Sequence, residues 1–534
     1  MTMRRTLALL GLLMTLASSE VRCAPPPQGP SPEIDAYLEK ARKDWNIPGL
    51  AVAVVQGDAT MAKGYGVREL GKPEPVDENT VFDAASLSKS FTAALAAILV
   101  DEGKMKWDDP IRRYLPDLVL PDPYLAENAT LRDFLSHRTG LEPANMMWLL
   151  TANSRAEVLR RVRCLKPAAP FRTDMVYSNV GFTVAGEAIA AAAGTTYEAL
   201  LRDRLIVPLG LKSTTAGYAQ AQVMPNHATP HALIDGVQRP IRFETQRDST
   251  APAGAVQSSA ADLARWLRFQ LDGGVLDGKR LISEASMREM HSPQVIISTT
   301  PEMRAARLVE FFAAYGMGWQ VMDYRGNPLL WHTGSGNGQL AFMALIPAKR
   351  LGVVVLVNTW AAPFVHGALV NYLLDAYLGY PPRDWSAEAL ARVPAMLEQA
   401  RKEWQEKTAG AVPELSRPPA SYTGTYESCL YGPIHVRQKG TGLTLQMGEG
   451  QKADLTHHHD DTFILMWRDP LFREERSTLI SFDLGDAAAR KLSMTIGRDQ
   501  IEAQATLAPL SEPRGHSPRR NSSAAGKNSF GRSM

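Results

Sequence analysis

The stretch DAASLSKSFTAALAAILVDEG at residues 83–103 constrains the fold more than any other part of the sequence. Its large apolar residues at helical spacing are Phe91, Leu95, Ile98 and Leu99. Alanines fill most of the positions between them, so the predicted helix is apolar nearly all the way round, and we expect it to be buried. A buried helix start has no packing need for Ser86 and Lys89, a hydroxyl and an ammonium group one turn apart.

Length and composition indicate a soluble globular protein with two domains. The 534 residues exceed what one ordinary hydrophobic core holds. Hydrophobic residues make up 45% and charged residues 21% of the chain, which is typical of globular proteins. The formal net charge is only +2, and the composition gives no sign of the folded basic face that nucleic-acid binding requires.

The composition of both ends of the chain indicates that neither belongs to a folded domain. Arg4 and Arg5 precede the apolar run LALLGLLMTLA, which is too short for an ordinary membrane-spanning helix but suits a secretory signal peptide. We therefore expect residues 1–24 to be a signal peptide, the protein to be secreted or periplasmic, and the mature chain to lack a membrane span. The basic tail at residues 511–534 has too little apolar content to pack, and we expect it to be disordered.

The order of local patterns predicts the fold class of the first domain, residues 30–384. A helical pattern and the strand-like run GLAVAVVQGD come first, a mostly helical stretch follows at residues 83–270, and strand patterns return at residues 315–360. Strands before and after a helical insertion indicate one shared sheet. The predicted class is α+β, an antiparallel sheet flanked by helices with a helical subdomain.

A second, all-β domain is predicted after a helix and linker at residues 385–418. Short strand patterns separated by turn residues fill residues 419–508. Besides Cys23, the chain contains Cys164 and Cys429, which are far apart in sequence and fall in different predicted domains. We therefore predict no disulfide framework.

The pair Ser86 and Lys89 is weak evidence of chemistry when taken alone. A serine hydroxyl is a poor nucleophile unless a nearby base accepts its proton, and a partly desolvated lysine can do so. Ser86 as a helix cap and Lys89 as a solvated first-turn residue would explain the same pattern.

Two further polar motifs follow in the chain. The segment PFRTDMVYSNVGF places Tyr177 and Asn179 two residues apart, just before an apolar helical run. The segment WHTGSGNG lies between two strand patterns and supplies His332, Thr333, Gly334 and Ser335. A turn aromatic, a helix cap, a glycine turn and an edge histidine would explain these residues one by one, but not their joint occurrence and order.

In this order and at this spacing, Ser-x-x-Lys, Tyr-x-Asn and His-Thr-Gly resemble the motifs of the penicillin-recognising serine hydrolases. The resemblance is to the branch of class C β-lactamases, DD-peptidases, D-aminopeptidases and related esterases, and it covers about residues 32–380. It implies the β-lactamase/transpeptidase-like fold and a small-molecule or peptide substrate with an amide or ester bond. It implies no cofactor and no metal. The C-terminal domain resembles a small barrel-like module often appended to such hydrolases.

The resemblance also implies a role for each motif residue. Ser86 would attack a carbonyl and become acylated, while Lys89 and Tyr177 manage its proton, and which of the two is the base stays open. Asn179 would hold Lys89 and the substrate amide. The oxyanion would lie between the backbone N–H groups of Ser86 and Ser335.

His332 departs from the pattern of the β-lactamases of this branch, which carry lysine there. A histidine with an unperturbed pKa near 6.5 can lose its charge around pH 7, whereas a lysine would offer a substrate carboxylate a permanent cation. Thr333 and Gly334 keep the pattern. We therefore predict peptidase, amidase or esterase activity and low β-lactamase activity.

One alternative function stays open, and another is disfavoured. A penicillin-binding or sensor protein that is acylated but turns over slowly would carry the same motifs. An α/β-hydrolase is disfavoured because the chain has no G-x-S-x-G motif.

Other histidines are predicted to be structural. His457, His458 and His459 are adjacent in the sequence, and neighbouring residues of a strand point to opposite faces, so we do not expect them to bind one metal ion together. His137 in LSHRTGL is expected to support the fold. The sequence predicts no particular oligomeric state.

Overall fold

The computed structural model describes residues 30–506, apart from residues 152, 243–244, 300–311, 337, 413, 470–471, 473–477, 486–488 and 498. The predicted signal peptide and basic tail lie outside these residues. Within the described ranges, no helix has both the length and the apolar character needed to cross a membrane.

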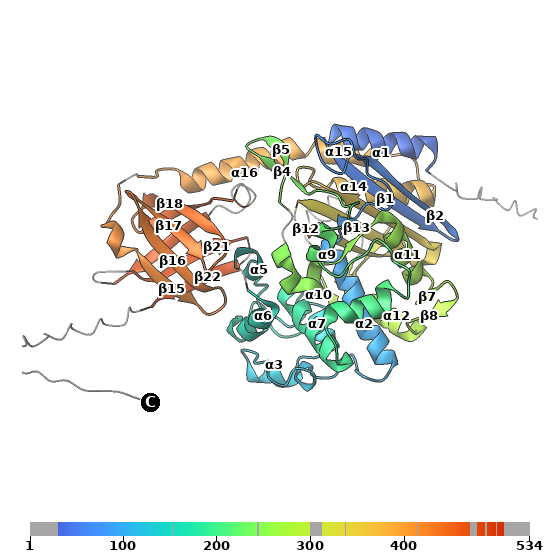
Figure 1. Ribbon diagram of the computed structural model, residues 1–534, viewed down its shortest axis with the longest axis horizontal. Helices are drawn as coiled ribbons and strands as arrows, with labels where there is room; N and C mark the ends of the chain where they lie inside the picture. The colour runs from blue at the N-terminus through green and yellow to red at the C-terminus, as the bar shows by residue number, and fades with distance from the viewer. Residues whose placement is uncertain are drawn as a thin grey trace, which may run out of the picture.

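An eight-stranded antiparallel sheet, with the order β2-β1-β14-β13-β12-β11-β10-β9, forms the centre of the larger part of the protein (Figure 1). Its strands are β1 (Gly49–Gln56), β2 (Ala59–Gly66), β9 (Val295–Ile296), β10 (Ala313–Tyr315), β11 (Gln320–Tyr324), β12 (Asn327–Gly336), β13 (Gln339–Ile346) and β14 (Leu351–Val357). β1 pairs with β14 from Leu50 opposite Val357 to Gln56 opposite Leu351. The first and last parts of this domain therefore share one sheet, as predicted.

Helices cover both faces of the sheet (Figure 1). On one face, α1 (Pro32–Asp44) and α14 (Val365–Leu378) bury apolar side chains against the strands, and α15 (Trp385–Leu390) packs on α14. On the other face, α11 (Ala260–Leu271) packs on β1 and β14. The helical subdomain adjoins this second face.

The helix α2 (Ser88–Asp101) lies inside the helical subdomain, preceded by the 3₁₀ turn η1 (Ala85–Leu87). Every residue of α2 from Ser88 to Leu99 is buried. Its neighbours include α7 (Asn179–Ala193), α10 (Ala251–Gly254) and α12 (Glu284–His291). On α11, the ring of Trp266 stacks on Phe91 with 3.9 Å between ring centroids. The prediction of a helix buried on all sides is confirmed.

The remaining elements of this domain are short. The helical ones are η2 (Ile111–Arg113), α3 (Pro123–Asn128), α4 (Leu131–Leu135), α5 (Met147–Leu150), α6 (Arg155–Arg161), η3 (Val162–Cys164), α8 (Tyr197–Leu201), the π-helical turn η4 (Arg202–Ile206), α9 (Tyr218–Gln222), η5 (Thr245–Thr250) and η6 (Pro347–Lys349). Three small antiparallel pairs join β3 (Phe82–Asp83) to β6 (Gln257–Ser258), β4 (His231–Ile234) to β5 (Val237–Pro240), and β7 (Val275–Leu276) to β8 (Lys279–Arg280).

A closed antiparallel barrel of eight strands forms the C-terminal part of the protein. After η7 (Pro419–Ser421), the strands are β15 (Gly424–Ser428), β16 (Gly432–Lys439), β17 (Gly442–Met447), β18 (Lys452–His459), β19 (Thr462–Trp467), β20 (Thr478–Leu484), β21 (Ala489–Ile496) and β22 (Asp499–Ala505). Alternate residues along each strand are buried, so apolar side chains fill the interior. The exposed helix α16 (Val393–Thr408) leads from the sheet domain to the barrel (Figure 1).

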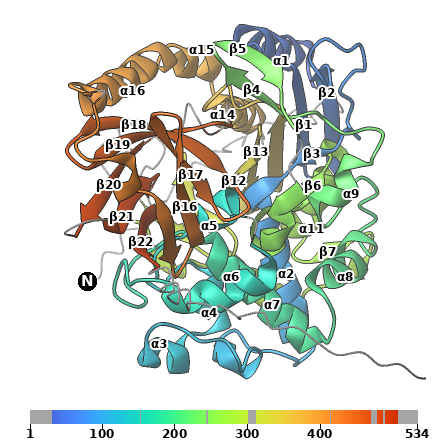
Figure 2. The same cartoon turned by 60° about the vertical axis from the view of Figure 1, so that its left-hand side comes forward.

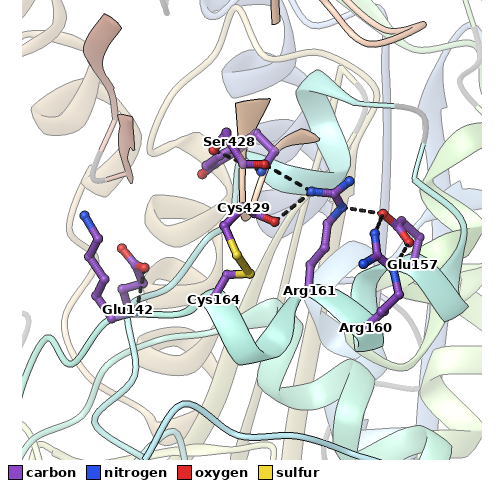
Figure 3. Close-up of a disulfide and its surroundings, with 9 residues drawn as sticks. Glu142, Glu157, Arg160, Arg161, Cys164, Ser428 and Cys429 are labelled. Carbon is purple, nitrogen blue, oxygen red and sulfur yellow. Dashed lines mark hydrogen bonds and ion pairs between the residues drawn. A yellow bond between two sulfur atoms is a disulfide. The ribbon is translucent and has the colours of Figure 1, made fainter. Parts of the chain in front are cut away.

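A disulfide joins Cys164 in η3 to Cys429 in the turn between β15 and β16 (Figure 3). Their Cα atoms are 5.7 Å apart, although 265 positions separate the two cysteines in the sequence. The prediction of no disulfide was wrong. Sequence separation carries no information about the pairing here, because the packing of the barrel on the helical subdomain is what brings the cysteines together.

The neighbouring Arg161 on α6 strengthens the same contact. Its Nη1 donates to the backbone oxygens of Ser428 at 3.2 Å and Cys429 at 2.7 Å, and its Nε pairs with Glu157 (Figure 3). The side chain is almost fully buried. A covalent bond and a buried guanidinium therefore fix the β15–β16 turn against α6 and η3.

We expect removal of the disulfide to lower stability. The double variant C164S/C429S leaves neither partner of the disulfide as an unpaired thiol and should lose about 2–4 kcal/mol of unfolding free energy, because the unfolded chain regains the freedom that the cross-link removes. The measurement is urea unfolding with and without a reductant. Reductant should destabilise the wild type and leave the double variant unchanged. A wild type that is fully reduced by mass spectrometry yet equally stable would contradict the expectation.

Candidate active site

Ser86 lies in η1, where the first turn before α2 meets strand β12 of the sheet. The approach is close: a Cβ atom on Gly334 of β12 would lie 2.4 Å from the backbone oxygen of Ala84. Only glycine fits at this position without moving the backbone. The structure thus brings the predicted Ser-x-x-Lys and His-Thr-Gly segments into direct contact.

The backbone just before Ser86 is strained and held by a buried carboxylate. Ala85 has φ of +45°, a conformation that costs energy for a residue with a side chain. Asp83 Oδ1 accepts a hydrogen bond from the Ala85 N–H at 2.8 Å, and Asp83 Oδ2 accepts one from the Tyr218 hydroxyl at 2.8 Å. Sequence reasoning missed Asp83 and Tyr218, because neither belongs to a motif that marks a backbone support.

Three predicted residues meet at one oxygen atom. Ser86 Oγ lies 3.0 Å from Lys89 Nζ and 2.9 Å from the hydroxyl of Tyr177. Tyr177 comes from the loop just before α7, whose N-cap is the next residue, Ser178. The hydroxyl, the amine and the phenol therefore form a chain of hydrogen bonds.

Lys89 is completely buried and is surrounded by oxygen atoms. Besides Ser86 Oγ, its Nζ contacts Asn179 Oδ1 at 2.7 Å and the backbone oxygen of Ala253 at 2.8 Å. All three oxygens belong to uncharged groups, so they compensate little for removing an ammonium from water. Burial lowers the pKa of Lys89 well below its ordinary value, which favours the neutral amine.

Tyr177 is a protonated donor in this environment. It keeps part of its surface exposed, but the surrounding protein raises its pKa above the ordinary value, and the hydrogen bond to Ser86 only partly opposes that rise. Lys89 Nζ lies over the ring, 4.8 Å from its centroid. A tyrosine with a raised pKa is a poor base at neutral pH.

His332 is buried and neutral. Its Nδ1 lies 2.6 Å from the backbone oxygen of Thr333, which can only accept, so Nδ1 carries the proton. Its Nε2 lies 2.9 Å from the hydroxyl of Tyr315 and accepts a hydrogen bond from it. Burial is the main cause that lowers the pKa of His332, to about 3. The strand pattern around Tyr315 gave no signal of this partnership.

A small, partly open hollow lies beside Ser86. Its lining includes Ser335 at the end of β12, Asn179, Trp148 on α5 and Tyr218. Ser335 is exposed, so its position at the hollow fits a contact with substrate. Thr333 and Gly334 complete the strand edge that leads to it.

Asn145 is a further polar residue of the site that sequence reasoning missed. Its Oδ1 accepts hydrogen bonds from the backbone N–H of Asn179 at 3.2 Å and from the Asn179 side-chain amide at 3.0 Å. Asn179 Oδ1 is then turned toward Lys89. An asparagine in an irregular loop has no periodic pattern that would have revealed this role.

The other histidines make contacts within the fold. His137, with φ of +60°, accepts at Nδ1 a hydrogen bond from the Ser178 N–H, and its ring lies 4.4 Å from that of Tyr177. His457 Nδ1 lies 2.7 Å from the backbone oxygen of Val412. Across the described ranges, no three His, Cys, Asp or Glu side chains are grouped as a metal site would require.

Two family models match the chain, described as Beta-lactamase over residues 34–377 and as a domain of unknown function, DUF3471, over residues 407–508. "Unguisins hydrolase ungD" of Aspergillus violaceofuscus is 30% identical over 77% of this chain and 78% of its own length. "Penicillin-binding protein 4" of Amycolatopsis lactamdurans is 28% identical over 64% of this chain and 89% of its own. The solved octameric penicillin-binding protein homologue from Pyrococcus abyssi shares the fold, with a TM-score of 0.57 at 19% identity over 88% of this chain and 99% of its own.

We expect His332 to make stability depend on pH. Unfolded, it titrates near the ordinary value of 6.5, whereas folded it titrates near 3. Between these values the unfolded state binds a proton that the folded state excludes, so the free energy of unfolding falls as pH decreases. This residue contributes a slope of about 1.4 kcal/mol per pH unit in that window.

Urea unfolding of the wild type and H332Q across the acidic range measures this contribution. The glutamine oxygen can still accept from Tyr315, and H332Q should show a shallower slope. The control is H459Q, which changes a ring that is 54% exposed on the barrel. Equal slopes in the wild type and H332Q would contradict a neutral, buried His332.

Proposed function

This chain belongs to the β-lactamase family of serine hydrolases, and we propose that it cleaves an amide or ester bond through an acyl-enzyme on Ser86. We also propose that the protein is exported, on the strength of Arg4, Arg5 and the apolar run that follows them. The observation that carries the catalytic proposal is the placement of Ser86 Oγ between Lys89 Nζ and the Tyr177 hydroxyl.

Lys89 is the base that accepts the serine proton in this mechanism. Its Nζ lies within hydrogen-bonding distance of Asn179 Oδ1, Ala253 O and Ser86 Oγ. As a neutral amine it would donate to the first two oxygens, and its lone pair would accept the proton of the Ser86 hydroxyl. The Tyr177 phenol donates to Ser86 Oγ from the other side. In this arrangement the Tyr177 hydroxyl donates to Ser86, and Ser86 donates to Lys89. Lys89 is therefore favoured over Tyr177 as the base.

The acylation steps follow from this arrangement. Ser86 Oγ bonds to the substrate carbonyl carbon as its proton moves to Lys89, and the carbonyl π electrons move to oxygen. Backbone N–H groups of Ser86 and Ser335 bind the resulting oxyanion, each worth roughly 3 kcal/mol. As the carbon–leaving-group bond breaks, Tyr177 protonates the leaving nitrogen or oxygen and recovers a proton from Lys89. Water then attacks the ester and releases the acyl group.

The neutral His332 supports substrates other than classical β-lactams. It offers no fixed cation to a substrate carboxylate, whereas the β-lactamases that this chain resembles carry lysine in that position. Peptides, amides and esters without a strict need for a carboxylate are therefore the proposed substrate class. Asn179 lies at the hollow and would bind the substrate amide.

Labelling with a fluorophosphonate probe tests the nucleophile. Ser86 should carry the adduct, because it is the serine whose hydroxyl contacts a neutral amine at the hollow, and S86A should carry none. The matched control is S90A, which removes a serine hydroxyl from the buried part of α2 and should still be labelled. Peptide mass spectrometry locates the adduct. Equal labelling of S86A and the wild type would refute the mechanism.

Relative rates on a substrate panel test the substrate class. Without a lysine cation at position 332, kcat/KM for nitrocefin should be about 10- to 100-fold below that of a class C β-lactamase run alongside. Esters or D-amino acid amides should be turned over steadily. A burst without turnover would instead indicate a protein that is acylated and stays so. Nitrocefin hydrolysis at the rate of the β-lactamase control would contradict the assigned role of His332.

A further inference from the structure

The barrel packs against the same loop that helps to build the active site. Residues 142–166 carry Asn145 and Trp148, and α5 and α6 from this segment lie beside the barrel strands (Figure 2). The backbone N–H of Gln451, in the turn after β17, donates to the oxygen of Leu150 at 3.2 Å. The contact is tight, since a Cβ atom on Gly450 would lie 2.2 Å from that oxygen.

One contact in this interface reaches toward the catalytic residues. Asp499, the first residue of β22, accepts at Oδ2 a hydrogen bond from the backbone N–H of Met146 at 2.5 Å. The same oxygen accepts the hydroxyl hydrogen of Tyr431 at 2.9 Å. Asp499 and Tyr431 are both buried, so the carboxylate is held in a fixed position by the barrel.

Further contacts connect Met146 to Lys89, the proposed base. Met146 follows Asn145 in the chain, and Asn145 holds both the backbone and the side chain of Asn179. Asn179 Oδ1 contacts Lys89 Nζ at 2.7 Å, and Lys89 contacts Ser86 Oγ. Each link is a direct hydrogen bond or a peptide bond, so a displacement of the loop at Met146 changes the position of Asn179.

We infer that Asp499 is a positioning residue for the acylation reaction and that the C-terminal barrel is part of the active-site structure. Asp499 fixes the loop that places Asn145, and Asn145 orients the asparagine that holds Lys89. The disulfide and Arg161 fix the far end of the same segment. The inference rests on the proposed roles of Ser86 and Lys89.

A second carboxylate–tyrosine pair in the barrel provides a matched control. Asp461 accepts the hydroxyl hydrogen of Tyr422 at 2.8 Å, as Asp499 does from Tyr431. The contacts of Asp461 are with the barrel and with the segment just before its first strand. Substitution at either pair removes a carboxylate–tyrosine hydrogen bond from the barrel. Only the Asp499 pair contacts the loop at Met146.

The test measures the kinetics of fluorophosphonate inactivation, which separate the maximal rate constant kinact from the binding constant KI. In D499A, kinact should fall about tenfold or more, because a small displacement of catalytic groups has a large effect on rate. KI should stay within about twofold, since the small probe makes few contacts with the loop. D499N keeps an oxygen that can accept from Met146 and should recover at least half of the wild-type kinact. D461A should retain the wild-type kinact.

If D499A does not fold, two milder variants, Y431F and Y422F, test the same inference. Y431F keeps the carboxylate but removes one hydroxyl that orients it, and should lower kinact about threefold. Its control Y422F should leave kinact unchanged.

Equal kinact values for D499A and D461A, or for Y431F and Y422F where D499A is unfolded, would overturn the inference while leaving the proposed function intact. A wild type that takes no adduct at Ser86 would overturn the proposed function, and the inference with it.

Discussion

The burial of Lys89 among uncharged oxygens is the constraint on which the rest of the site depends. Because α2 is apolar all round, the fold covers it on every side, and its first turn is carried into the interior with it. Asn179 comes from α7 and Ala253 from α10, so two further helices must pack correctly to receive the amine. The reactivity proposed for Ser86 is thus a property of how the helices pack, more than of the serine itself.

On the sheet side of the site, burial also favours the uncharged form of a titratable group, here His332. His332 is neutral because β12 is buried and because Tyr315 and the Thr333 carbonyl satisfy both ring nitrogens of that uncharged form. In the proposed mechanism, then, neither His332 nor Lys89 supplies a fixed positive charge to the hollow before reaction. In the proposed mechanism the charge arises when Lys89 takes the serine proton, at the moment when the oxyanion forms beside it. Electrostatic stabilisation that appears only during reaction assists the chemical step more than it assists substrate binding.

Sequence patterns predicted the parts of the fold that obey a simple period. The buried α2, the strands of the sheet and the all-β C-terminal domain were recognisable from apolar spacing, and two motifs predicted that Ser86, Lys89 and Tyr177 act together. Asn145 and Tyr315 were missed because an isolated polar residue in a loop or strand carries no periodic signal. The link between Cys164 and Cys429 was missed for a different reason. It depends on how two separately patterned domains dock, and local spacing does not encode docking.

The span of that disulfide has a consequence for how the protein responds to proteolysis. The cross-link closes a ring of chain that contains most of the sheet and the exposed helix α16. A protease that cuts α16 opens this ring without dividing the protein, because Cys164 and Cys429 still join the two pieces. Under oxidising conditions the barrel would stay tethered beside Asn145 after such a cut, and its release would require both peptide cleavage and reduction.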